Sequence, residues 1–275
     1  MLARYLPPRT YAVVSAYEGD ALVGVIAAAE IGSDDAVDLE FPKVNPFRDG
    51  QALTIHLDNR TGVESFTPEL LVYRASVKAS ATRCREGSLR AVPVEYELRY
   101  SDRVVDSFKA PGWEYPRDAR PPVAPRETPL KRLALADERE RDNKLGVWIT
   151  RAADRPHTTV MAFLSSVDDD IFLISHADTF KSKCLARDGR CLYAIDHRAS
   201  YRFEKAIDWN YTIIRGETFT VPRSNPLFEE LQARFVEKNP WELGFFTDPK
   251  VVLHHVRPLE VMCPEKYARS VPAAR

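Results

Sequence analysis

Short apolar runs separated by polar turns fill most of the chain, and this pattern predicts β-strands rather than helices. Residues 11–30 form two such runs around Glu18-Gly19-Asp20, a composition typical of a hairpin turn. Residues 52–58 and 69–81 continue the pattern, and a second hairpin is expected over 94–108. No long segment with a helical period precedes about residue 128. Residues 1–110 are therefore predicted to form a small antiparallel β domain.

Proline then interrupts the pattern at Pro111, Pro116, Pro121, Pro122, Pro125 and Pro129. The interior of a sheet does not tolerate this density, because proline cannot donate a ladder hydrogen bond. We therefore predict a linker over residues 111–129, followed by a second domain over 130–275. Thr128-Pro129 has the sequence of a helix start, and a helix is expected from there through Lys144.

Beyond that segment the strand pattern becomes regular. Strands are expected over 145–151, 158–165, 171–175, 191–196, 211–219, 251–253 and 256–261. A short helix is expected after 171–175, and a longer one over 226–238, where apolar residues have helical spacing. The predicted fold class is mainly β, with a six-stranded antiparallel barrel in the C-terminal half and a small antiparallel β domain before it.

Charge and cysteine content narrow the possible partners. The 39 basic and 40 acidic residues nearly cancel, which gives no global electrostatic argument for binding nucleic acid or an anionic membrane. The four cysteines form no CxxC pair, so reduced thiols are expected rather than a disulfide framework or a zinc site. No window is apolar over the roughly 18 residues of a membrane span, and no secretory signal is recognised. We expect a cytoplasmic protein.

The segment 171–187, IFLISHADTFKSKCLAR, has the most informative chemistry. An apolar strand ends at Ser175 and His176, and a polar turn leads to the start of a helix at Thr179, Lys181, Ser182 and Lys183. Hydroxyls, lysines and helix N–H groups at a strand end suit a phosphate monoester. An ordinary N-cap followed by two solvated lysines would have the same sequence.

The order of motifs over residues 156–185 resembles the FMN-binding split barrel of the pyridoxamine 5'-phosphate oxidase-like superfamily. The resemblance covers roughly residues 130–265. It rests on the turn Asp154-Arg155-Pro156-His157, the strand ending in Ser175-His176, the pattern Thr179-x-Lys181-x-Lys183, and the later segment DWNYTIIRGETFTV. The resemblance implies a split β-barrel, an FMN cofactor, and a homodimer with the flavin site at the subunit interface.

Carried over by position, the resemblance implies a set of cofactor-binding residues. Backbone atoms of Thr159, Val160 and Met161 would contact the isoalloxazine ring, Ser175 and His176 the ring or ribityl chain, and Thr179 and Lys181 the phosphate. Phe180 stands where family oxidases commonly have an arginine, so Lys183 or Arg187 would compensate. The arginine-rich substrate signature of pyridoxamine phosphate oxidases is not evident over 251–266, which argues against that specific activity.

Several of these residues have simpler interpretations. Trp209 and Tyr211 lie two apart, so they share a strand face and would either stack on a bound ring or pack in a core or interface. His157 and His176 have no metal-ligand spacing. His254 and His255 alternate faces, and we expect one to point inward and the other into solvent. No G-x-S-x-G or G-x-G-x-x-G motif suggests a hydrolase or a dinucleotide fold.

Two functions from different classes follow. The first is an FMN-dependent oxidoreductase that passes electrons or hydride from a reduced nicotinamide or redox partner to a small acceptor, with no catalytic residue identified. The second is a non-catalytic module that senses flavin or another ligand. The role of residues 1–110 stays open at this level.

Overall fold

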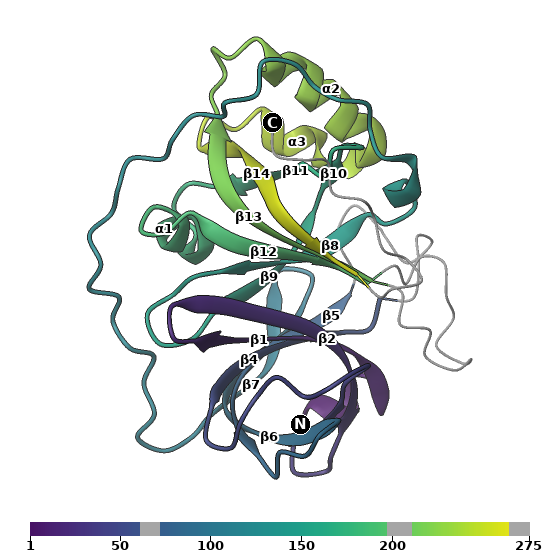
Figure 1. The fold of residues 1–275 in the computed structure, drawn as a ribbon, viewed down its shortest axis with the longest axis vertical. Coiled ribbons are helices and arrows are strands. Elements are labelled where there is room, and N and C mark those ends of the chain that lie inside the picture. The colour runs from purple at the N-terminus through teal and green to yellow at the C-terminus, as the bar shows by residue number, and fades with distance from the viewer. Residues whose placement is uncertain (61–71, 197–210, 264–275) are drawn as a thin grey trace. The chain divides into compact units, whose positions relative to one another are not determined.

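The computed structural model describes residues 1–60, 72–196 and 211–263 (Figure 1). The predicted fold class is confirmed: the protein is mainly β, with two antiparallel sheets and few short helices. Internal contacts divide it into two compact units. The first holds Met1–Ala119 and Ala152–Thr159, and the second holds Arg120–Arg151 and the described parts of 160–200 and 210–275.

The first unit is built on a closed six-stranded barrel. Its strands are β1 (Arg9–Glu18), β2 (Ala21–Ile31), β3 (Val37–Glu40), β4 (Ala52–Asp58), β5 (Tyr73–Thr82) and β6 (Ser88–Tyr100). They pair in the order β3-β2-β1-β4-β5-β6, and the pairing of β3 with β6 closes the ring. The strand β7 (Arg103–Lys109) continues along the same edge of β6. A short 3₁₀ turn, η1 (Leu2–Arg4), precedes the barrel.

Side chains at every second position along the strands fill the interior of the barrel, as the sequence predicts. Leu53, Ile55 and Leu57 of β4 all belong to the apolar core of this unit. The hairpin between β1 and β2 is confirmed, with Glu18 paired to Ala21. Its turn residue Gly19 has φ +57°, the left-handed region in which glycine carries no steric cost.

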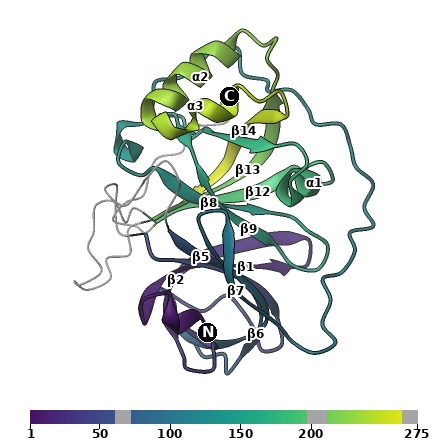
Figure 2. The same cartoon turned by 180° about the vertical axis from the view of Figure 1, so that it is seen from behind.

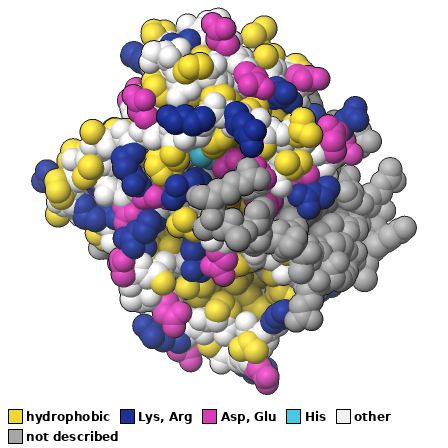
Figure 3. All heavy atoms as spheres, turned by 45° about the horizontal axis from the view of Figure 1, so that its top comes forward, with side chains coloured by type: hydrophobic (Ala, Val, Ile, Leu, Met, Phe, Trp, Pro, Cys, Tyr) yellow, Lys and Arg dark blue, Asp and Glu magenta, His cyan; other side chains and the backbone are white. Residues whose placement is uncertain are grey.

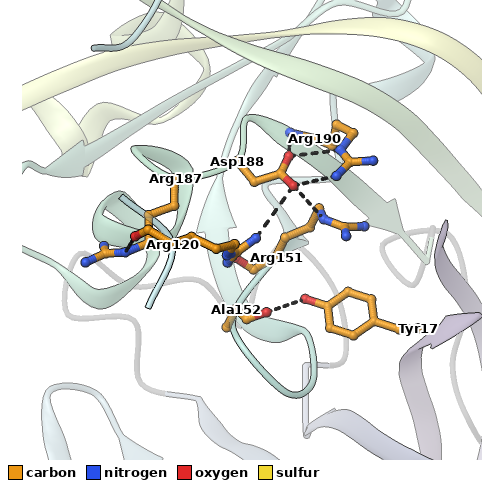
Figure 4. Close-up of polar contacts among 7 residues, drawn as sticks. All are labelled: Tyr17, Arg120, Arg151, Ala152, Arg187, Asp188 and Arg190. Atoms are coloured by element: carbon orange, nitrogen blue, oxygen red, sulfur yellow. Dashed lines mark hydrogen bonds and ion pairs between the residues drawn. The ribbon is translucent and has the colours of Figure 1, made fainter. Parts of the chain in front are cut away.

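The outer face of β4 and β5 is polar yet buried, because the segment Ala152–Thr159 lies against it. The Tyr17 hydroxyl donates to the carbonyl of Ala152 at 2.8 Å (Figure 4). Further along, the hydroxyl of Thr54 and the ammonium of Lys78 both donate to the carbonyl of Pro156. The turn at 154–157, on which the family resemblance partly rests, is thus held by hydrogen bonds to its backbone.

The second sheet has seven antiparallel strands in the order β10-β11-β14-β13-β12-β8-β9, and all but the first residues of β9 belong to the second unit. Its strands are β8 (Leu145–Thr150), β9 (His157–Ala162), β10 (Leu164–Ser165), β11 (Ile171–His176), β12 (Arg190–Ile195), β13 (Thr212–Val221) and β14 (Val251–Met262). Figure 2 shows the long strands β13 and β14 side by side. The strands expected over 251–253 and 256–261 are parts of the single strand β14.

The register of β13 and β14 shifts between Arg215 and Gly216, which leaves Leu259 of β14 without an opposite residue, as in a β-bulge. The position requires glycine, because a Cβ at residue 216 would lie 2.5 Å from the carbonyl oxygen of Arg257. The register continues beyond the bulge and pairs Phe219 with His255 and Thr220 with His254. The bulge therefore helps to set which residues of β14 face each side of the sheet.

Helices are short and few in the described parts of the chain. They are α1 (Phe180–Leu185), α2 (Leu227–Lys238) and α3 (Leu243–Phe246), with 3₁₀ turns η3 (Glu138–Glu140) and η5 (Pro240–Glu242). The helix predicted over 226–238 is confirmed as α2, whose Leu227, Leu231 and Phe235 are buried. None of the described helices has the length and apolarity to cross a membrane.

The helix predicted from Thr128 through Lys144 is wrong, since only the turn η3 forms in that segment. Long-range pairing prevails over the local signal: Glu127 bridges Thr220, and Ala136 bridges Ser166. The Thr128 hydroxyl does accept from Leu130 N–H, but it also bonds His255 Nδ1 at 2.7 Å. A residue with the sequence of a helix cap is thus used to attach the chain to the sheet.

The expectation that one of His254 and His255 faces solvent is also wrong, because both are buried, on opposite faces of β14. His255 lies between Phe172 and Phe219, and its Nε2 bonds Asp170 at 2.7 Å. With Thr128 on Nδ1, both ring nitrogens of His255 have partners. A histidine whose polar atoms are all paired can be buried at little cost.

At the C-terminal end of α2, Lys238 is buried with an apolar neighbour. Its Nζ lies 3.7 Å from the centre of the Phe163 ring and has no hydrogen-bond partner among the described residues. Burial lowers the pKa of Lys238 to about 7, although the charge of Glu140 acts in the opposite direction. The interaction of an ammonium with the face of an aromatic ring replaces only part of the hydration free energy that the ammonium loses on burial.

Lys238→Met should therefore stabilise the protein at pH 7, by about 2 kcal/mol, the scale on which apolar residues replace buried charges. The unfolded chain binds a proton at Lys238 up to its ordinary pKa of 10.5, whereas the folded chain loses it near 7. Wild-type stability should rise between these pH values, and the variant should lack this contribution. Urea unfolding of wild type and Lys238→Met at pH 7 and 9.5 measures the free energy of unfolding of each protein at each pH. Lys250→Met, at an exposed lysine, is the control, and equal pH dependence in all three proteins would contradict the assignment.

Candidate phosphate-binding site

The strand β11 delivers a cluster of hydroxyl groups to the start of α1. Residues 171–175 are buried, and His176 ends the strand. Thr179 is the N-cap of α1, and its side chain accepts from Ser182 N–H as the sequence predicts. Ser175 Oγ lies 3.0 Å from Ser182 Oγ, which lies 2.9 Å from Thr179 Oγ1. Three hydroxyls therefore gather where a strand passes into a helix.

The buried imidazole of His254 completes this cluster from β14. Its Nε2 lies 3.0 Å from Ser175 Oγ, and its ring meets the edge of Trp148. His254 Nδ1 has no hydrogen-bond partner among the described residues. Burial lowers the pKa of His254 to about 3, and the positive charge of Lys181 adds to the effect. The imidazole is therefore neutral at physiological pH and acts as a fixed hydrogen-bonding group.

Because the ring of His254 is neutral, one assignment of donors and acceptors in the cluster is favoured. A buried N–H without a partner costs more than an unused acceptor nitrogen, so the proton belongs on Nε2. Nε2–H then donates to Ser175, Ser175 donates to Ser182, and Ser182 donates to the carbonyl of His176 at 2.8 Å. The Thr179 hydroxyl donates to the same carbonyl at 2.9 Å. All three hydroxyl hydrogens therefore have acceptors within the protein, and a phosphate would bind here by replacing these acceptors.

The structure separates the two lysines predicted to hold the phosphate. Lys181 is half-buried and close enough to act on His254, whereas Lys183 is exposed. Residues two apart on a helix do not share a face. Arg187, the other residue expected to compensate for Phe180, donates to the carbonyls of Arg120 and Lys183, at the opposite end of α1 from Thr179. Lys181 is thus the cation most closely associated with the hydroxyl cluster.

The three residues expected along the ring, Thr159, Val160 and Met161, lie on β9, the last strand of its sheet among the described residues. Val160 is buried, and Thr159 and Met161 on either side of it are half-buried. The Met161 carbonyl accepts from the Tyr193 hydroxyl at 2.9 Å, and the Thr159 hydroxyl bonds His157 Nε2 at 3.0 Å. An edge strand of this kind offers backbone groups to a ligand.

The remaining predicted contacts lie at the rim or outside the described residues. His176 is 36% exposed, with Nδ1 3.7 Å from an Asp248 carboxylate oxygen and its ring against Phe245. Trp209 lies outside the described residues. Figure 3 shows that basic and acidic side chains are interspersed on the face in view.

Sequence reasoning included Ser182 in the polar turn without assigning it to the site, and it missed His254. Ser182 follows Thr179 by three residues, so a helix starting at Phe180 places the two hydroxyls on one side of its first turn. This signal was present in the sequence. The contribution of His254 depends on the register that places it opposite Leu173, two residues before Ser175, and nothing local encodes that register.

No protein-family model matches the chain, and no curated protein is significantly similar to it in sequence. Solved structures do resemble a little less than half of the chain. The Agrobacterium tumefaciens protein Atu2129, of unknown function, is 16% identical with a TM-score of 0.40, over 47% of this chain and 53% of its own. The chain thus spans about half the length of that protein.

Two further solved structures match a similar share of this chain. The heme storage protein HutZ from Vibrio cholerae is 14% identical with a TM-score of 0.39, over 46% of this chain and 89% of its own. A putative pyridoxamine 5'-phosphate oxidase from Listeria innocua is 16% identical with a TM-score of 0.32, over 44% and 87%. Similarity at this level assigns neither a cofactor nor a reaction to this chain.

The protonation state of His254 can be tested directly. Because burial holds its pKa near 3, its ring should stay neutral with the proton on Nε2 from pH 8 down to pH 5. Long-range ¹H–¹⁵N NMR distinguishes both tautomers from the charged ring, and a His254→Phe sample assigns the signal. Stability should fall as pH drops below the ordinary value of 6.5, because the unfolded chain then binds a proton that the folded chain excludes. A ring that titrates above pH 5 would contradict the buried, neutral state.

Proposed function

We propose that the chain binds FMN, with the flavin phosphate held by Thr179, Ser182 and Lys181. The observation that carries this proposal is the cluster of three hydroxyls at the end of β11, backed by a neutral histidine and beside a half-buried lysine. The hydroxyls of Thr179 and Ser182 can each donate one hydrogen to a phosphate oxygen, and the ammonium of Lys181 supplies opposite charge. Because α1 has only six residues, these side chains matter more than a helix dipole.

The residues on β9 support the same ligand. Half-buried Thr159 and Met161 lie on an edge strand, where backbone groups can contact a planar heterocycle. The sequence resemblance assigns Ser175 and His176 to the ring or ribityl chain. With Trp209 added, these are the positions we propose for the ring and ribityl chain. We also propose a homodimer with the flavin between subunits, which rests on the resemblance alone.

When bound, FMN would supply hydride or electron transfer between a reduced nicotinamide or redox partner and a small acceptor. The chain would bind the phosphate and orient the flavin through the hydroxyl cluster. It would offer no proton there from His254, since burial holds the pKa of that ring near 3. The alternative, a flavin-binding module without turnover, uses the same site.

Lys181→Ala should weaken FMN binding about tenfold, the loss expected for one charged hydrogen bond of about 1–3 kcal/mol. Titration of apo-protein with FMN, followed by quenching of flavin fluorescence, measures the affinity. Lys109→Ala is the matched control, because it removes an exposed lysine of β7, which contributes no residue to the proposed site. Equal affinity in wild type, Lys181→Ala and Lys109→Ala would place the phosphate elsewhere.

The absorbance spectrum of the purified, FMN-reconstituted protein tests the function as a whole. Flavin bands near 375 and 450 nm should appear, and anaerobic NADH or NADPH should bleach them within seconds if the protein is an oxidoreductase. Stable colour with no bleaching would favour the binding module. A protein that takes up no FMN at millimolar concentration would overturn both functions.

A further inference from the structure

One face of the second sheet carries buried polar groups within an apolar core. The strands β8 and β14 are separated in this sheet by β12 and β13, which in a flat sheet would put them about 14 Å apart. The rings of Trp148 on β8 and His254 on β14 nevertheless lie only 5.3 Å apart, centre to centre. The sheet is therefore curled, and both side chains point into its concave side.

Strand pairing places Thr150 on the same side of the sheet. Thr150 is two residues from Trp148 on β8, so the two share a face. Its direct partner on β12, Cys191, belongs with Trp148 to one apolar core. Leu173, the direct partner of His254 on β11, belongs to the same core. Trp148, Thr150 and His254 therefore line one interior.

Each of these three side chains has a buried polar atom without a hydrogen-bond partner among the described residues. The atoms are Trp148 Nε1, Thr150 Oγ1 and His254 Nδ1. Trp148 and Thr150 are fully buried, and His254 is 5% exposed. Native interiors leave few polar atoms unpaired, because an unpaired atom has lost its hydrogen bonds to water without replacement. Three such atoms along one interior indicate a ligand.

The thiol of Cys191 lies beside these groups but does not take the place of a ligand. The indole of Trp148 acts on this thiol, yet the two groups do not meet in hydrogen-bonding geometry. The thiol instead bonds the Thr218 hydroxyl at 3.3 Å. Burial raises the pKa of Cys191 to about 11, so the thiol is neutral at physiological pH, and its sulfur is a weak acceptor.

The polarity of the three unpaired atoms decides the class of ligand. An indole N–H can only donate, and His254 Nδ1 can only accept while the proton lies on Nε2. An anion would accept from Trp148 but would be repelled by the lone pair of Nδ1, and a cation would be repelled by the indole N–H. The ligand must therefore be neutral and able both to accept and to donate. Water has this property, and a buried water makes about three hydrogen bonds.

We propose that Trp148, Thr150 and His254 bind an ordered water molecule in this interior. The water accepts from the indole N–H, which leaves its two hydrogens for His254 Nδ1 and Thr150 Oγ1. With Nδ1 accepting, His254 keeps its proton on Nε2, which lies 3.0 Å from Ser175 Oγ. Trp148 and Thr150 are thus positioning residues for the hydroxyl cluster, whichever ligand binds there.

NMR detects the water directly in the wild-type protein. The indole Hε1 of Trp148 should show a cross-peak to water that has the sign of the diagonal in NOESY and the opposite sign in ROESY, as a long-lived bound water gives. Trp148→Phe assigns the signal, and backbone-linked assignment of Trp148 replaces this variant if it does not fold. A cross-peak with the sign of the diagonal in both spectra reports proton exchange alone. That result, or no cross-peak, would overturn the proposal.

The stability of Thr150→Val distinguishes a hydroxyl that binds water from one that is unpaired. The first loses a hydrogen bond on substitution, whereas removal of an unpaired buried hydroxyl is favourable. We expect the urea midpoint of Thr150→Val to fall below that of wild type. Thr10→Val gives the shift for a known hydrogen bond, because the buried Thr10 hydroxyl donates to the carbonyl of Asp58 at 2.9 Å. A midpoint of Thr150→Val at or above that of wild type would contradict the bound water.

The ¹⁵N signals of His254 test the positioning role. In wild type, Nδ1 should resonate upfield of an acceptor nitrogen that has no hydrogen bond. Thr150→Val should move this signal downfield, because one of the groups that hold the water is gone, and Thr150→Ser, which keeps the hydroxyl, should leave it near the wild-type position. An identical signal in all three proteins would overturn the positioning role. None of these measurements uses FMN, so their outcome is separate from that of the proposed function.

Discussion

The second unit depends on the pairing of β14 with strands on both of its edges. β11 lies along one edge and β13 along the other, so His254 and His255 are each fixed by two registers at once. Because neighbouring residues on a strand point to opposite faces, one histidine reaches the hydroxyls at the end of β11 and the other lies between Phe172 and Phe219. A shift of one residue would exchange them and leave both without partners.

The two histidines show how the same residue type can be buried by different means. His255 has a partner on each ring nitrogen, Thr128 and Asp170, and these contacts also hold the incoming chain and the turn before β11. His254 has a partner on one nitrogen only, and its burial excludes the charged form. The first is therefore a structural connection, and the second is a neutral group directed at a cluster of hydroxyls.

Local pattern was enough to predict most strands, α2 and the cap of α1, because alternation and capping act over a few residues. It failed at 130–144, where Thr128 and Pro129 have the sequence of a helix start but the chain pairs with residues 220 and 166 instead. It also missed the closure of the first barrel, because β3 pairs with β6 across about 50 residues of chain. In the site, the three-residue spacing of Thr179 and Ser182 was enough to predict that their hydroxyls lie together. The position of His254 could not be predicted in this way, because only the sheet register brings it to Ser175.

The N-terminal end of α1 presents hydrogen-bond donors more than charge. Phe180 replaces the arginine expected from the family pattern, and its exposed ring contributes no charge. A neutral imidazole stands behind the hydroxyls, so a bound anion there would meet mainly hydrogen-bond donors and one ammonium. Donors of moderate charge suit a ligand that is also held through an extended ring, because the ring adds contacts that the phosphate alone does not make.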